Sequence, residues 1–128
     1  MSCWDEKYRS NLVRPETLIV EFIDAGWTPI LQTPPFPEYT NGHSVVSTAA
    51  SEVLTEIFGP DFSFLDDTEV PYGLPIREFD SFKDAANEAA MSRIYGGIHY
   101  ESAVYEGQVQ GKLVGELVSE QLDLIKEK

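Results

Sequence analysis

Residues 43–58 read His-Ser-Val-Val-Ser-Thr-Ala-Ala-Ser-Glu-Val-Leu-Thr-Glu-Ile-Phe, and this stretch decides the fold. Its apolar side chains recur every three or four residues, which predicts a helix with one buried face. That face comprises Val46, Ala49, Ala50, Val53, Leu54 and Ile57. Gly59-Pro60 then ends the helix. Gly42 and His43 are therefore expected at a helix N-terminus, where free amides and the positive end of the helix dipole favour an anion.

The rest of the chain predicts an all-α fold, with about five helices packed as a bundle in a single domain of residues 1–128. Helices are expected over about 2–13 and 16–24, from the capping residue Asp80 or Ser81 to about Tyr95, and over about 100–125. Pro15 suits the first turn of the second helix, and Gly26 its end. Residues 27–41 form a Pro-rich, stiff connection, and residues 61–79 are predicted to be loop.

The last predicted helix carries a row of small residues at every fourth position: Ala103, Gly107, Gly111 and Gly115. Each glycine costs a helix about 1 kcal/mol relative to alanine. Such a row indicates that another helix passes very close. The partner is expected to be the helix after His43 or a helix from outside this chain.

Composition excludes several classes of partner. The net charge is −13, with 22 acidic residues against nine basic ones, which argues against binding to nucleic acid or to an anionic membrane. No apolar run approaches the roughly 18 to 20 residues that a membrane span requires. Cys3 is the only cysteine, so no internal disulfide can form. The first six residues are polar and acidic rather than signal-like, and any export signal would lie upstream, so no localisation is predicted.

Three short stretches point to one chemistry. They read Lys-Tyr-Arg-Ser-Asn-Leu-Val-Arg-Pro over residues 7–15, Phe-Pro-Glu-Tyr-Thr-Asn-Gly-His over 36–43, and Ser-Arg-Ile-Tyr-Gly-Gly-Ile-His over 92–99. Four of the nine basic residues fall in them, and three of these, Lys7, Arg14 and Arg93, are the candidate anion-binding cations. Both histidines of the chain, His43 and His99, also fall in these stretches. Arg and Lys suit a phosphate-like oxyanion, and a histidine can attack or ligate its central atom or move protons near neutral pH.

At these residues the chain resembles the vanadium-dependent haloperoxidase and type 2 phosphatidic acid phosphatase superfamily. Its pattern is Lys, six residues, Arg-Pro; then Pro-Ser-Gly-His; then Ser-Arg, five residues, His, three residues, Asp. Lys7 and Arg14 keep the first spacing, Gly42-His43 keeps the end of the second, and residues 92–99 keep the third. The sequence around Phe36 and Tyr39 is similar to the corresponding sequence of the soluble haloperoxidases.

The resemblance implies a role for each matching residue. Vanadate, or phosphate in the same site, would be bound by Lys7, Arg14, Asn41, Gly42 and Arg93. His99 would be the axial ligand of vanadium, or the nucleophile of a phosphatase, and His43 would be the general acid-base. Phe36 would line the halide side. In the peroxidase reaction, vanadate would act as a pentavalent Lewis acid while peroxide oxidises a halide.

Two positions depart from the family pattern. Thr40-Asn41 stands where the family has Pro-Ser, and the Asn41 amide can still donate a hydrogen bond to an oxyanion. Ala103 stands where many members place the Asp that orients the attacking histidine. An orienting partner for His99 must therefore come from elsewhere in the protein.

Three functions remain open from the sequence. The first is a vanadate-dependent haloperoxidase, and the second is a soluble acid phosphatase that uses the same site through a phosphohistidine. The third is a non-catalytic half-domain that binds anions or assembles with another chain. Because the family places the lysine motif well inside the chain, we expect residues 1–128 to correspond to the C-terminal, motif-bearing part of a longer architecture. Such a part would form a homo-oligomer or pair with the missing N-terminal half.

Overall fold

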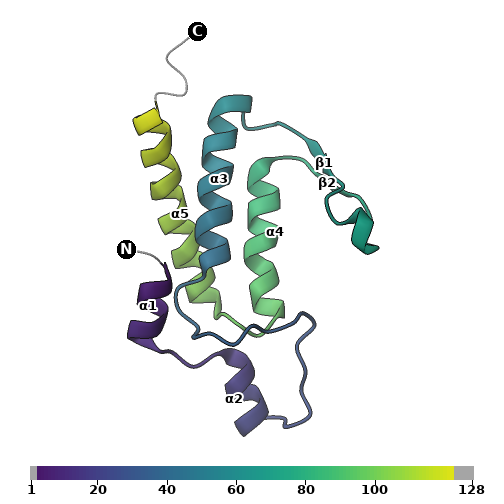
Figure 1. Cartoon of the computed structure of the whole chain (residues 1–128), viewed down its shortest axis with the longest axis vertical. Coiled ribbons are helices and arrows are strands. Elements are labelled where there is room, and N and C mark those ends of the chain that lie inside the picture. Colours follow the sequence, from purple (N-terminus) through teal and green to yellow (C-terminus); the bar gives the residue numbers. More distant parts are fainter. Residues whose placement is uncertain (1–2, 123–128) are drawn as a thin grey trace.

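The computed structural model describes residues 3–122, and its all-α architecture confirms the predicted fold class. Three long helices run side by side, while two short helices lie at one end of the molecule (Figure 1). The helices are α1 (Cys3–Ser10), α2 (Pro15–Phe22), α3 (Gly42–Phe58), α4 (Phe82–Tyr95) and α5 (Glu101–Leu122). Two short strands, β1 (Phe64–Asp66) and β2 (Arg77–Phe79), flank the 3-10 helix η1 (Val70–Tyr72).

Helix α3 lies at the centre of the bundle and packs against both α4 and α5. The small-residue row of α5 makes the closer of these contacts. A Cβ atom built on Gly111 would lie 2.5 Å from the Val45 backbone oxygen, and one on Gly115 would lie 2.8 Å from that of Ala49. The predicted close helix crossing is therefore confirmed, and its partner is α3.

The ends of α3 and α4 follow their local sequence signals. Asn41 caps α3 by accepting a hydrogen bond from the Ser44 amide, and Ser81 caps α4 by accepting one from the Asp84 amide. Gly59 ends α3 with φ of 98°, a conformation that favours glycine. Both predicted helices are confirmed to within a residue or two.

The short helices are shorter than predicted. Helix α1 ends at Ser10 rather than near residue 13, because Asn11 turns to a positive φ of 46°. Helix α2 begins at Pro15 as expected but ends at Phe22, well before Gly26. The end of the last predicted helix, beyond residue 122, lies outside the described residues.

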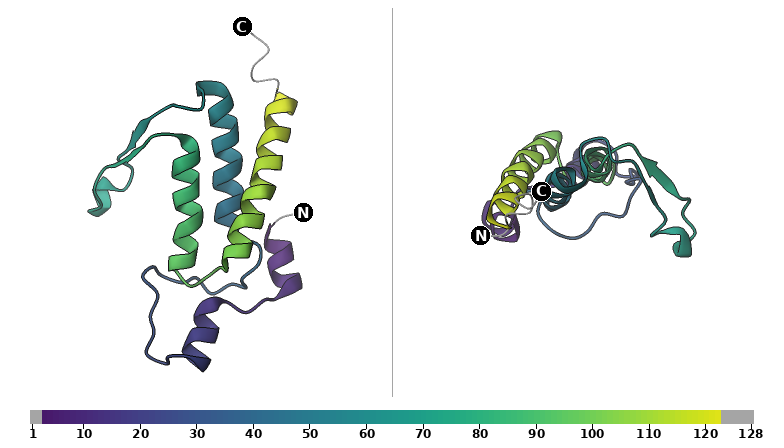
Figure 2. Two further views of the ribbon diagram at one scale, coloured as in Figure 1. Left: turned by 180° about the vertical axis from the view of Figure 1, so that it is seen from behind. Right: turned by 90° about the horizontal axis from the view of Figure 1, so that it is seen from above.

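The prediction of loop over residues 61–79 is wrong, because β1 and β2 pair antiparallel there, with Phe64 opposite Phe79. The two views of Figure 2 show this hairpin projecting beside the three long helices. Aromatic stacking ties its base to the start of α4 and the end of α3; the rings are Phe58, Phe62, Phe64, Phe79 and Phe82. The pairing depends on these non-local contacts, which periodicity in sequence does not reveal.

The Pro-rich connection between α2 and α3 passes under the corner that joins α4 to α5. Its Ile30 amide donates to the Tyr95 carbonyl oxygen, and the Thr33 hydroxyl donates to that of Gly96. Gly97 packs so tightly against Trp27 that an added Cβ would lie 2.8 Å from the indole ring. The connection thereby brings the first two sequence motifs to the same end of the bundle as the third.

Among the described helices, none is long and apolar enough to cross a membrane. Helix α2 nevertheless buries none of its residues within the chain. Phe22 and Ile23 are 77% and 78% exposed.

Candidate functional site

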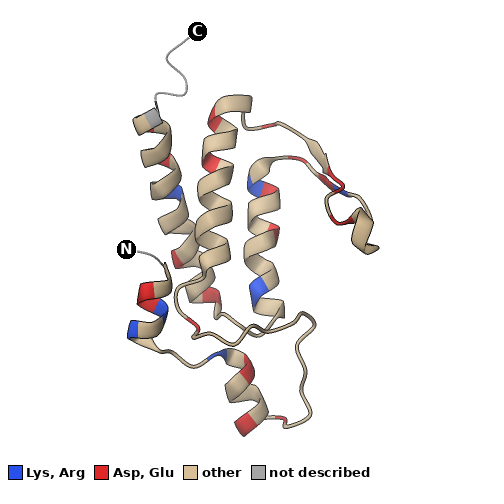
Figure 3. Cartoon of the chain, viewed as in Figure 1, with Lys and Arg blue, Asp and Glu red and all other residues tan. Residues whose placement is uncertain are grey.

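A cavity of about 590 Å³ opens between α1, the Pro-rich connection, α3 and α5. Of the eight predicted site residues, five line it: Lys7 and Gly42 of the oxyanion set, the catalytic candidates His43 and His99, and Phe36 of the halide pocket. They come from all three sequence motifs. Figure 3 shows basic positions of α1, of the loop before α2 and of the end of α4 at this same end of the molecule, although acidic positions predominate overall.

Lys7 is buried at the floor of this region, with 2% of its surface exposed. Its ammonium donates to the backbone oxygens of Pro37 at 3.2 Å and Glu38 at 3.0 Å. It also lies 4.7 Å from the centre of the Phe36 ring. Desolvation lowers the pKa of Lys7, and the neighbouring Cys3 and Glu38 side chains oppose that shift. Because an ammonium has three protons, one remains for an anion in the cavity.

His99 is buried and is held by a carboxylate that sequence reasoning missed. Its Nδ1 lies 3.3 Å from Oε1 of Glu38, whose side chain is likewise buried. The same oxygen accepts a hydrogen bond from the Tyr100 amide at 3.1 Å. Desolvation lowers the pKa of His99, and the hydrogen bond to Glu38 opposes that shift. The other ring nitrogen, Nε2, therefore remains available to bind a ligand in the cavity.

The N-terminal turn of α3 supplies neutral donors. Asn41 is fully buried, and its Oδ1 accepts from the Ser44 amide at 3.3 Å. Its Nδ2 has no hydrogen-bond partner among residues 3–122, and neither has the Ser44 hydroxyl. The first amides of a helix also lack intrahelical partners, which leaves those of Gly42 and His43 available. Buried donors of this kind cost stability unless a ligand or water satisfies them.

Arg93 and His43 complete the electrostatic environment. Nε of Arg93 is buried without a hydrogen-bond partner in the described part of the chain, and desolvation lowers the pKa of this guanidinium. His43 is exposed as a residue but lines the cavity. Desolvation lowers its pKa, and the positive charges of Arg93, His99 and Lys7 lower it further. The cluster is therefore rich in positive charge, and a bound oxyanion would relieve the repulsion.

Asn41 and Arg93 are not among the residues that line the cavity, and neither is Arg14. This residue is the N-cap of α2, and its Nη1 donates to the Pro34 backbone oxygen at 2.7 Å. It also lies 3.5 Å from the Glu16 carboxylate. The Glu16 amide in turn donates to the Gly97 carbonyl oxygen, so Arg14 is placed beside the α4–α5 corner.

Phe36 forms an aromatic wall of the cavity. Its ring lies edge-on to Trp4, with centres 5.1 Å apart, and its centre is 6.5 Å from that of the His99 ring. Trp4, which the sequence analysis did not single out, also lines the cavity. The wall lies beside the buried His99, whereas His43 is exposed.

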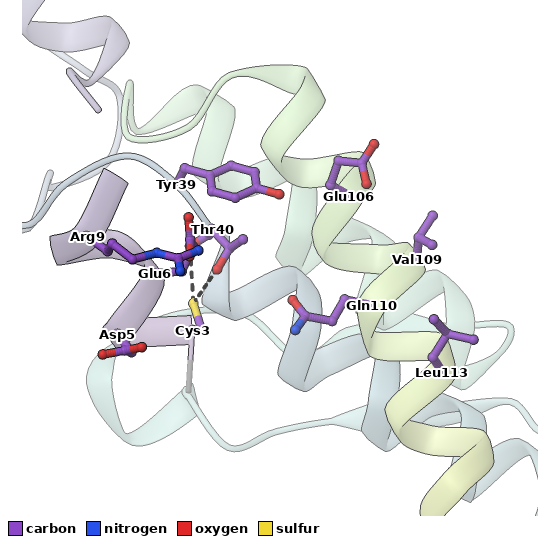
Figure 4. A pocket seen from close by; sticks show the side chains of 10 residues that line it. All are labelled: Cys3, Asp5, Glu6, Arg9, Tyr39, Thr40, Glu106, Val109, Gln110 and Leu113. Atoms are coloured by element: carbon purple, nitrogen blue, oxygen red, sulfur yellow. Dashed lines mark hydrogen bonds and ion pairs between the residues drawn. The ribbon is translucent and has the colours of Figure 1, made fainter. Parts of the chain in front are cut away.

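A second cavity, of about 550 Å³, lies on the other side of Cys3 (Figure 4). Tyr39, Glu106 and Gln110 face it, and Cys3 is hydrogen-bonded to Thr40 at its edge. Arg9 is the only cation among its lining residues, and Glu6 already pairs with it. This cavity lacks the free positive charge of the first one, so we regard the first cavity as the candidate site.

The fold and these motifs are shared with known proteins. A family model described as the VCPO second helical-bundle domain matches residues 20–127. The chain belongs to the vanadium-dependent haloperoxidase superfamily.

Solved haloperoxidase structures extend this finding. One, described as the first bacterial vanadium-dependent iodoperoxidase, is 69% identical, superposes with a TM-score of 0.88 and aligns with 94% of this chain. Holo and apo structures of a bacterial vanadium-dependent chloroperoxidase share the fold, each with 21% identity over 95% of the chain and TM-scores of 0.74 and 0.73. The chain spans 29% of the iodoperoxidase and 33% and 34% of the two chloroperoxidase structures. It matches none of the curated proteins.

The structure clarifies the two departures of this chain from the superfamily pattern. The side-chain oxygen of Asn41 caps helix α3, and its amide nitrogen remains available as a donor. Ala103 is buried in the first turn of α5. The carboxylate that contacts His99 comes instead from Glu38, the only acidic residue of the Pro-rich connection over residues 27–41. A single acid in this connection, in a chain that has Ala103 in place of the family Asp, was the sequence feature that could have indicated the role of Glu38.

Acidification should destabilise this chain through His99. Burial holds the pKa of His99 below 6.5 in the folded chain, whereas the unfolded residue titrates near about 6.5. Between these values the unfolded state binds more protons, so the free energy of unfolding falls as the pH drops through about 6.5. Urea denaturation of wild type and His99→Gln tests this. We expect the stability advantage of wild type to shrink between about pH 7.5 and 5.5.

Residues remote from His99 respond to pH in the same way in both proteins, so their effects on the free energy of unfolding cancel in that comparison. An advantage that stays constant over the whole pH range would show that His99 carries the same proton in both states.

Proposed function

We propose that this chain provides the oxyanion-binding part of a vanadium-dependent haloperoxidase whose halide is iodide. One observation carries the proposal: a single cavity is lined by Lys7, Gly42, His43 and His99, and the charge of Arg93 acts on both histidines. Iodide is favoured because the relative described as an iodoperoxidase is 69% identical over 94% of this chain. Since the chain spans 29% of that relative, the activity is proposed for the protein as a whole.

The residues present fit a vanadate ion. Nε of Arg93, Nδ2 of Asn41 and the Ser44 hydroxyl are buried polar groups without partners in the described chain. These three residues lie outside the cavity lining, and an oxyanion that reached them would accept their hydrogen bonds. Lys7 and the Gly42 amide would add a point charge and a backbone donor. Arg14 would have to release the Pro34 carbonyl oxygen in order to join them. Nε2 of His99 would ligate the vanadium.

When bound, vanadate would supply a Lewis-acidic centre that activates peroxide without a change in its own oxidation state. The neighbouring side chains would manage charge and protons. His43, kept neutral at neutral pH by its lowered pKa, would accept a proton from an incoming peroxide oxygen and return it to the departing one. Phe36 and Trp4 would keep water from that oxygen and leave room for a large, polarisable halide.

An acid phosphatase acting through a phosphohistidine at His99 uses the same groups. The contact between Glu38 and His99 favours this second candidate, because a carboxylate behind an imidazole raises its nucleophilicity.

Activity assays on the whole protein, of which this chain is the proposed oxyanion-binding part, separate these two functions. We expect triiodide formation that requires vanadate, peroxide and iodide together, with lower rates on bromide and chloride. We expect no hydrolysis of a chromogenic phosphate ester. Vanadate-sensitive ester hydrolysis without halide oxidation would replace the peroxidase with the phosphatase.

The exposed apolar surface favours assembly as an additional property. Helix α2 buries none of its residues, and Phe22, Ile23 and Ile30 are each more than three-quarters exposed. A surface of this kind is typical of a protein interface. We propose that it packs against the remainder of a longer haloperoxidase or, when that is missing, against a second copy. Sedimentation of the chain with and without Phe22→Asp tests whether this helix carries the association.

A further inference from the structure

We propose that Glu38 is the positioning residue of His99: its carboxylate fixes the imidazole as the Nδ1–H tautomer and so aims the lone pair of Nε2 at the bound oxyanion. This inference deepens the proposed function and rests on it for the identity of the anion. No family motif assigns this role, since the position that usually supplies the orienting carboxylate is Ala103 in this chain.

The geometry around Oε1 of Glu38 decides the direction of the hydrogen bond. The Tyr100 amide can only donate, and it donates to Oε1 at 3.1 Å. An ionised carboxylate oxygen only accepts, so Nδ1 of His99 at 3.3 Å must carry the proton. A neutral imidazole has one N–H, which leaves Nε2 as an unprotonated acceptor.

Burial makes this tautomer stable. His99 and Glu38 are each 2% exposed, so water does not compete for Nδ1 or for the carboxylate. The reverse tautomer would place a bare Nδ1 against a carboxylate oxygen, and two acceptors would face each other in a poorly solvated site. Ligating histidines in proteins are commonly held in this manner by a carboxylate or carbonyl group.

Glu38 also connects His99 to the cation beside it. The backbone oxygen of Glu38 accepts from Nζ of Lys7 at 3.0 Å, while its side chain holds His99. One residue therefore sets the position of two cavity-lining groups that are 92 positions apart in the sequence. A displacement of Glu38 is expected to disturb both together, whereas removal of the carboxylate alone should act on His99.

The test reads the tautomer directly. Long-range proton–nitrogen spectra of the 15N-labelled, anion-free full chain, recorded above the histidine pKa, distinguish Nδ1–H from Nε2–H. The chain has two histidines, so His43→Gln assigns the signals. We expect Nδ1–H for His99 in wild type, and Nε2–H in Glu38→Met, which keeps the side-chain length but removes the acceptor. Orthovanadate affinity, measured by calorimetry, should fall about 10- to 100-fold in that variant.

Two further variants control for folding and charge. Glu38→Gln keeps an acceptor oxygen, so it should retain the Nδ1–H tautomer with a smaller loss of affinity. Glu106→Met removes an exposed acid from α5 and should change neither readout.

An Nε2–H tautomer in wild type, or an unchanged tautomer in Glu38→Met, would overturn the inference. If Glu38→Met does not fold, the tautomers of wild type and Glu38→Gln still decide the question. An Nδ1–H tautomer in a wild-type chain that fails to bind vanadate would contradict the proposed function and leave the role of Glu38 standing.

Discussion

Gly111→Ala should destabilise the chain by about 2 kcal/mol or more, although alanine is the better helix former by about 1 kcal/mol. The new Cβ would lie 2.5 Å from the Val45 backbone oxygen and 2.8 Å from the Thr48 Cβ. Backbone atoms of α3 cannot move aside as a flexible side chain would, so α5 must shift away from its partner. Urea denaturation followed by circular dichroism measures the loss.

Gly26→Ala is the matched control for this prediction. Gly26 is exposed, and an added Cβ would meet only Asp24 Oδ1, at an ordinary contact distance of 3.4 Å. We expect a change within about 0.5 kcal/mol there. If Gly111→Ala were as stable as wild type, the helices would have to be farther apart than the structure has them.

Arg93→Met should weaken the binding of orthovanadate, and of phosphate in competition, by at least about 100-fold, or roughly 2.7 kcal/mol. The variant removes a partly desolvated positive charge and a guanidinium whose Nε has no partner among the described residues. Calorimetric titration of the full chain measures the affinity. His99→Ala should cause a similar loss for vanadate, because the proposed axial ligand is gone.

A second readout separates this effect from a folding defect. The charge of Arg93 lowers the pKa of His43, so Arg93→Met should raise that pKa in the anion-free protein. Arg77→Met makes the same substitution at an exposed arginine paired with Glu88, and it should leave affinity and pKa unchanged. Unaltered binding in both Arg93→Met and His99→Ala would rule out this cavity as the oxyanion site.

The sequence predicted those features whose causes are local or periodic. The limits of α3 follow from the cap at Asn41 and the stop at Gly59, and the crossing of α3 and α5 follows from a glycine at every fourth position. Five of the eight predicted site residues line one cavity, because each motif keeps a fixed spacing and the helix ends bring the motifs together.

Other features depend on contacts between distant segments. The strand pair exists because Phe64 meets Phe79 beside the aromatic rings at the ends of α3 and α4, and no single stretch encodes that meeting. Glu38 is a single acidic residue in a loop, and no sequence spacing relates it to His99. Only the fold shows that the two side chains are in contact. Arg14 kept its spacing, yet its guanidinium turns to the Pro34 carbonyl oxygen.

The glycine row of α5 also determines how the oxyanion site behaves on binding. A Cβ on Gly107 would lie 2.9 Å from the Asn41 backbone oxygen and 2.8 Å from the Ser44 Cβ, so the first turn of α3 rests directly on the backbone of α5. Donors in that turn are preorganised: they need no rearrangement to meet an anion, and little entropy is lost when one arrives. Three glycines lower the intrinsic stability of α5, and the close contact that they permit would hold the proposed oxyanion donors of α3 in place.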